Sequence, residues 1–107
     1  MTKDAIHRSS GNVFADLGVS HAERYLAKAE LASRILKIVQ QRRLTQQATG
    51  ELLGISQPKV SALLNGRLDG FSSDRMFRFL NALGCDVRIT ISLPHAKTPG
   101  RVKVTAS

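Results

Sequence analysis

Hydrophobic residues recur at helical spacing through the first long segment of the chain, from Ser20 to Arg43. Ser20 and Glu23 form a capping-box pair at its start, and no glycine or proline interrupts it. The apolar stripe comprises Ala22, Leu26, Ala29, Leu36 and Val39, widened by Tyr25, Leu31, Ile35 and Ile38. This pattern predicts one long helix whose stripe faces the core.

Three shorter segments follow, and each begins at a hydroxyl residue and stops at a glycine. Hydroxyl side chains suit helix N-caps, and glycine suits the left-handed residue after a helix. The predicted helices therefore span 45–53, 56–65 and 72–83. Phe71 and Met76 are spaced to form a hydrophobic staple around the start of the last one.

The periodicity changes to two between Asp86 and Leu93, where apolar and polar residues alternate. This alternation predicts a strand with one apolar face. A single strand leaves its backbone groups unpaired. Three solutions remain open at this point: a local hairpin with 101–105, pairing with the same strand of a second copy, or an extended terminus that covers the helices. Residues 101–105 themselves fit either a second, weaker strand or a basic tail.

With 107 residues, 42% hydrophobic and 22% charged, the chain has the size and composition of one soluble globular domain. We divide it into an irregular N-terminal segment (1–19), a helical domain (20–84) and a C-terminal strand with a basic tail (85–107). The expected fold is mainly α, with four to five helices and one C-terminal β-strand. The N-terminus lacks an apolar signal, no run is long enough for a membrane span, and the one cysteine fits a reducing compartment. We therefore expect a cytoplasmic protein.

The stretch from Leu44 to Gly66 has the layout of a helix-turn-helix motif, which we place at 45–66. Two short helices are joined by a tight turn at 53–56, in which Gly54 permits a positive φ and Ile55 fills the angle. Ala48 and Leu52 on the first helix are expected to share a core with Val60, Leu63 and Leu64 on the second. Ala48 is also the expected point of close helix approach. In such a motif the second helix lies in a DNA major groove.

The charge balance agrees with a nucleic-acid partner. Sixteen Lys and Arg residues against eight Asp and Glu give a formal net charge of +8. A small domain this basic is drawn to polyanions, although a basic surface also serves solubility alone. Double-stranded DNA with a palindromic operator is the expected partner. A homodimer is the expected state, because two recognition helices must lie about one DNA turn apart. We expect Val87, Ile89 and Ile91 to form the dimer interface.

Residue roles follow from position within the motif. Gln57 begins the recognition helix, where its amide can pair bidentately with adenine N6 and N7. Lys59 and Ser61 can reach base edges or flanking phosphates, and Pro58 and Ala62 offer apolar contact for a thymine methyl group. Cationic phosphate contacts are expected from the residues that flank the motif, Arg42, Arg43 and Arg67.

The motif resembles the Cro/C1-type helix-turn-helix of phage repressors and XRE regulators. The resemblance is carried by Thr45-Gln46, Ala48, Leu53-Gly54-Ile55-Ser56-Gln57, Val60-Ser61 and Asn65-Gly66. It implies that Gln46 binds a phosphate together with the N-terminus of its helix, and that Asn65 clamps a phosphate from the end of the recognition helix. Thr45, beside Gln46, is grouped with these phosphate contacts.

A narrower resemblance covers most of the chain. The segments Gly11–Gly18, Gln57–Ser61, Gly70–Ser72 and Asn81–Val87 are similar to small XRE antitoxins of the HigA-like type. That similarity implies an antitoxin of a type II toxin–antitoxin pair, which represses its own operon and binds a RelE-like toxin. A plain XRE or phage-type regulator without a toxin is the alternative. A protein-binding module that has lost its DNA role is a third reading, disfavoured by the charge and by the intact Gln46, Gln57 and Asn65.

Catalysis and metal binding find little support in the sequence. His7, His21 and His95 are far apart, and the single Cys85 has no neighbouring base. No glycine-rich phosphate loop occurs. We therefore expect no enzyme activity, no metal site and no cofactor.

Overall fold

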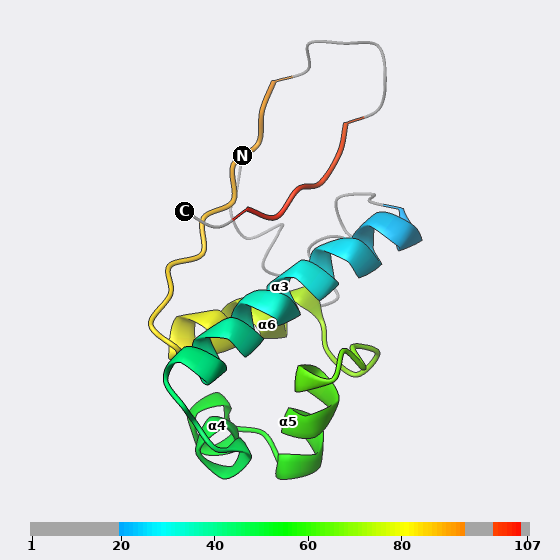
Figure 1. The fold of residues 1–107 in the computed structure, drawn as a ribbon. Coiled ribbons are helices and arrows are strands. Elements are labelled where there is room, and N and C mark those ends of the chain that lie inside the picture. Colours follow the sequence, from blue (N-terminus) through cyan, green and yellow to red (C-terminus); the bar gives the residue numbers. More distant parts are fainter. Residues whose placement is uncertain (1–19, 94–99, 106–107) are drawn as a thin grey trace.

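The computed structural model describes residues 20–93 and 100–105, and within these ranges the chain forms four α-helices (Figure 1). They are α3 (His21–Gln41), α4 (Gln46–Leu53), α5 (Gln57–Leu64) and α6 (Ser73–Ala82). Each predicted helix is present, and its ends lie within two residues of the predicted ones. The irregular segment expected at 1–19 lies outside the described residues.

Hydroxyl side chains cap three of the four helix starts. The backbone nitrogens of Glu23, Ala48 and Arg75 donate to the side-chain oxygens of Ser20, Thr45 and Ser72, at 3.2, 3.0 and 3.2 Å respectively. Ser56 stands at the N-cap of α5 but makes no side-chain capping bond. The start of α5 instead relies on Pro58, whose fixed φ suits the first turn and which has no N–H to satisfy.

Helix α3 ends in a left-handed residue that is not a glycine. Arg43 has a φ of 54°. The amide of Leu44 donates to the carbonyl of Val39 at 3.0 Å, and that of Arg43 donates to Gln40 at 3.1 Å, which together form a Schellman motif. A non-glycine residue in this conformation costs about 1–2 kcal/mol. The other left-handed residues of the described chain are Gly54, Gly66 and Gly84.

The core lies where α3 packs against α5 and α6, and where α4 packs against the same two helices. Its most deeply buried side chains are those of Ile35, Val60, Leu63, Met76 and Leu83. Phe71 and Met76, the predicted staple pair, both lie in this cluster. Phe71 and Phe79 meet edge to face, with their ring centroids 5.9 Å apart and their planes at 74°.

The predicted stripe of α3 is partly wrong. The buried residues of α3 are Ala27, Leu31, Ala32, Ile35 and Val39, whereas Tyr25 and Leu26 are 57% and 66% exposed. The first half of this helix carries apolar residues on more than one face, so spacing alone does not select the buried one. Ala27 and Ala32 are buried and belong to the core cluster.

The close approach of α4 to α5 occurs at Gly50, not at Ala48. A Cβ atom at position 50 would lie 2.7 Å from the carbonyl oxygen of Ile55 and 3.3 Å from Cγ2 of Val60. Thr49 is fully buried, and its hydroxyl donates to the carbonyl of Thr45 at 2.8 Å. Leu52, predicted to be core, is 46% exposed. The turn is as predicted, because Gly54 is left-handed and Ile55 packs against the core.

The strand expected at 86–93 does not form within the part of the chain that the structure describes. Residues 85–93 and 100–105 form no strand and no β-bridge. In Figure 1 the segment 85–93 runs away from the end of α6, on the side of α3 opposite α4 and α5. A strand needs a hydrogen-bonded neighbour, and the described single chain supplies none here. A strand at 86–93 and its dimerisation therefore remain predictions.

Candidate nucleic-acid interface

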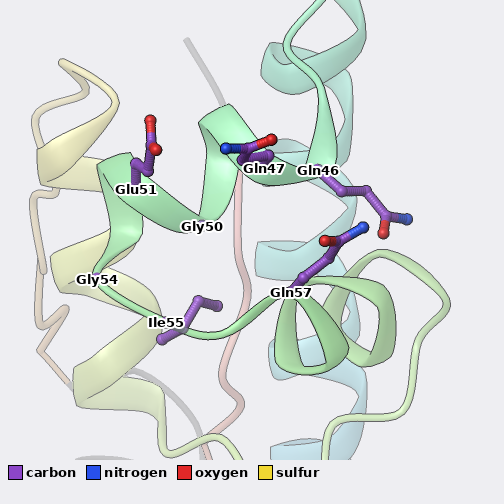
Figure 2. Close-up of a pocket in the computed structure, with 7 residues that line it drawn as sticks. All are labelled: Gln46, Gln47, Gly50, Glu51, Gly54, Ile55 and Gln57. Carbon is purple, nitrogen blue, oxygen red and sulfur yellow. The ribbon is translucent and has the colours of Figure 1, made fainter.

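A hollow of about 380 Å³ opens on the outer side of the helix-turn-helix, between α4 and the start of α5. Its lining residues are Gln46, Gln47, Gly50, Glu51, Gly54, Ile55 and Gln57. Figure 2 shows the side chains of Gln46 and Gln57 extending on the same side, one from the start of each helix. Both residues are exposed. Two side-chain amides that can donate and accept hydrogen bonds therefore line one hollow, each from the first residue of its helix.

The first turn of α5 presents the side chains predicted to read bases. Gln57, Pro58 and Lys59 are exposed, so a groove wall can reach them directly. Ser61 and Ala62 are half-buried, and Ala62 packs against the core. The predicted base-contacting residues thus lie together on α5, but Ser61 and Ala62 point partly toward the interior. A base contact from Ala62 would use only the outer part of its methyl group.

The phosphate contacts implied by family resemblance occupy the two ends of the motif. Thr45 uses its hydroxyl to cap α4, one residue before Gln46. Asn65 follows α5, and its Nδ2 donates to the carbonyl of Ser61 at 2.8 Å and to the Ser61 hydroxyl at 3.3 Å. Asn65 is exposed, with its carbonyl Oδ1 outside these two bonds. The amide nitrogen of Asn65 thus bonds the C-terminal turn of α5, and a phosphate contact from Asn65 remains a prediction.

All four predicted cationic residues are exposed: Arg42, Arg43, Lys59 and Arg67. Within the described residues, the side chains of Arg43, Lys59 and Arg67 have no ion pair and no hydrogen bond. The single ion pair of that region joins Arg34 to Glu30 on α3, at 3.1 Å. Positive charge with no internal partner remains available for phosphates.

Arg42, the fourth predicted cation, is placed differently. Its Nη2 donates to the carbonyl oxygen of Leu83, the C-cap residue of α6, at 2.5 Å. The guanidinium therefore ties the end of α3 to the end of α6. This is an intramolecular role that the sequence pattern does not reveal, because positions 42 and 83 are far apart in the chain.

The predicted dimer residues fall into two groups. Val87 is half-buried and packs against the helical core of its own chain. Ile89 and Ile91 are 55% and 75% exposed, and Leu93 is 85% exposed. The strict alternation of the sequence put all four side chains on one face. In the structure only those beyond Val87 are free to meet a partner.

Gln47 and Glu51 line the hollow but were not among the predicted site residues. They are four residues apart on α4, so they share one helix face, and Figure 2 shows both side chains on that helix beside the hollow. That spacing is the signal that could have identified them once Gln46 was placed at the helix start.

Other classes of site find no basis in the described residues. No group of three or more His, Cys, Asp or Glu side chains lies close enough to hold a metal ion there. Cys85 is half-buried and unpaired. None of the described helices combines the length and apolar character needed to cross a membrane.

Comparison with known proteins agrees with this geometry. A family model described as a helix-turn-helix domain matches residues 13–92. A solved structure named as an XRE family transcriptional regulator is 42% identical to the chain, with a TM-score of 0.77. The match covers 82% of this chain and all of that one. No curated protein matches the chain significantly. The chain belongs to the XRE family of helix-turn-helix DNA-binding proteins.

Proposed function

We propose that this protein is a transcriptional regulator that binds an operator sequence and represses the promoter that contains it. The observation that carries the proposal is that Gln46 and Gln57, the first residues of α4 and α5, both line one exposed hollow. Gln57 would contact a base edge in the major groove, and Gln46 would contact the adjacent phosphate. The name of the similar solved structure supports a role in transcription. The protein acts by binding rather than by catalysis.

In this proposal the DNA-bound form is a homodimer. Ile89, Ile91 and Leu93, which we call the exposed apolar row, are each more than half exposed. Pairing this segment with its copy would satisfy the backbone groups of both and bury both rows. A two-fold dimer would then present two recognition helices to a palindromic operator.

The experiment is a selection of DNA duplexes from a random pool by the full chain, followed by a footprint on the promoter of its own gene. The expected product is a sequence with two inverted half-sites whose centres lie about 10 base pairs apart. The footprint should cover the same sequence. Recovery of duplexes with no shared sequence would contradict the proposal, because Gln57 would then not read bases.

The finer proposal is that the protein also acts as an antitoxin for a RelE-like toxin. Its support is the resemblance of segments 57–61, 70–72 and 81–87 to HigA-like antitoxins. The test is co-expression of the chain with the product of the adjacent gene, with cell growth and co-purification as readouts. Growth arrest by the neighbour alone, relieved by this chain in a co-purifying complex, would support the antitoxin role. A harmless neighbour that does not co-purify would leave the plain regulator as the function.

A further inference from the structure

We infer that Arg42 and Asn81 fix the direction in which the C-terminal segment leaves α6, an arrangement we call the brace. The brace thereby sets the distance between the two recognition helices of the dimer. The inference rests on the proposed function, because it takes segment 85–93 as the dimer contact. Arg42 and Asn81 would then be the residues that fix the operator spacing. Arg42 becomes a positioning residue in place of a phosphate contact.

The end of α6 is held by two backbone hydrogen bonds and by one from the side chain of Asn81. The amide of Cys85 donates to the carbonyl of Leu80, and that of Gly84 donates to Asn81, both at 2.9 Å. These bonds form a Schellman motif around the left-handed Gly84. The Nδ2 of Asn81 then donates to the carbonyl of Cys85 at 3.0 Å. The chain direction is therefore fixed for the first residue after the turn.

Arg42 connects this turn to another part of the fold. Its Nη2 donates to the carbonyl of Leu83 and also lies 3.6 Å from the place a Cβ atom of Gly84 would occupy. Arg42 is the C-cap residue of α3, and α4 begins four residues later at Gln46. The same short connection therefore holds both the exit of the C-terminal segment and the start of the helix-turn-helix.

The constraint extends two residues further. Val87 packs against the core, so the segment is held on the domain as far as this side chain. Exposed apolar side chains begin immediately afterwards, at Ile89. The part of the segment proposed to meet a partner thus starts at a point fixed relative to α4 and α5.

A fixed starting point has a consequence for DNA recognition. Each extra base pair between two half-sites moves them apart by about 3.4 Å and rotates one against the other by about 35°. If the C-terminal segment leaves each domain in a fixed direction, the dimer fits only one half-site spacing. At any other spacing the two recognition helices cannot bind together, and the second contact loses its high effective concentration. A dimer with a loose exit tolerates several spacings.

The experiment measures affinity for operators whose half-site spacing is changed by one or two base pairs in either direction. The wild-type chain should lose about tenfold or more in affinity at a spacing one base pair from the best. Asn81→Ala and Arg42→Ala should reduce this preference to about threefold or less and remain dimeric by sedimentation. Asn81→Ala changes no charge and removes an exposed side chain, so its fold and its affinity for random duplex should be unchanged.

Lys37→Ala is the matched control for Arg42→Ala, because it removes the same charge from an exposed position of α3. It should keep the wild-type spacing preference. Dimeric variants with an unaltered spacing profile would overturn the brace and leave the proposed function intact. A wild-type chain that is monomeric, or that protects a single half-site, would overturn the proposed dimer and the brace with it. If only Arg42→Ala has an effect, and that effect is weaker binding to all duplexes, Arg42 is a phosphate contact and the brace is wrong.

Discussion

Gly50 on α4 faces the backbone carbonyl of Ile55 so closely that a Cβ atom would lie 2.7 Å from that oxygen. This contact sets how near the first helix of the motif comes to the turn and to α5. Alanine at position 50 would force the backbone of the turn to move. We expect Gly50→Ala to lower the free energy of unfolding by about 1–3 kcal/mol, as overpacking does, despite the better helix propensity of alanine. Chemical denaturation measures the change.

Gly70→Ala is the control, because nothing lies within 4 Å of its added Cβ and its φ is not left-handed. That variant should be neutral or more stable by about 0.4–1 kcal/mol. Equal stability of the two variants would show that the approach at Gly50 is looser than described.

Arg43 provides a second prediction, in which stability and DNA binding change in opposite directions. Glycine relieves the left-handed conformation, so Arg43→Gly should raise the free energy of unfolding by about 0.5–1 kcal/mol. The same change removes a cation with no internal partner, so affinity for DNA should fall. Denaturation and binding titrations on one sample measure both effects. Gln41→Gly, in the last turn of the same helix, should instead cost about 1 kcal/mol. A less stable Arg43→Gly would show that residue 43 is not in the left-handed conformation.

Assembly is tested by a charge in the exposed apolar row. Ile89→Asp should separate the dimer, because burial of a carboxylate in the partner contact is costly. The monomer should remain helical, since its core comes from the four helices. Sedimentation and circular dichroism measure these two properties. Thr90→Asp adds the same charge at the neighbouring exposed position and should leave the dimer intact. Continued dimerisation of Ile89→Asp would assign the interface to another surface.

The salt dependence of operator affinity reports how many phosphates the protein contacts. Three available cations per subunit, Arg43, Lys59 and Arg67, give six contacts per dimer. The slope of log affinity against log salt concentration should therefore be about −5. Phosphate binding by Arg42 as well would steepen the slope to about −7. A slope shallower than about −3 would show that most of these side chains point away from the DNA.

Helix positions in this chain are predictable from the sequence because each helix carries its own start and stop signals. Ser20, Thr45 and Ser72 accept the capping bonds that their residue types predict. The tight turn at Gly54 follows in the same way from local chemistry. These features depend on residues within a few positions of one another.

Features that depend on distant contacts were not predictable. Which face of α3 is buried depends on where α5 and α6 pack. The sequence pattern therefore places Leu26 in the core, where it is not, and omits Ala27, which is buried. The bond from Arg42 to Leu83 joins residues that only the fold brings together. The alternation at 86–93 specifies a strand only when a neighbouring strand supplies the hydrogen bonds. The described residues of the single chain contain no such neighbouring strand.

The central claim is that the hollow between α4 and α5 reads a DNA sequence through Gln57. The most direct test is the affinity of Gln57→Ala for the selected operator and for a scrambled duplex of equal length and salt. Gln40→Ala, an exposed glutamine on α3, is the matched control and should bind as the wild type does. We expect Gln57→Ala to lose about 1–3 kcal/mol of binding free energy on the operator and little on the scrambled duplex. Equal losses on both duplexes, or none on either, would contradict it.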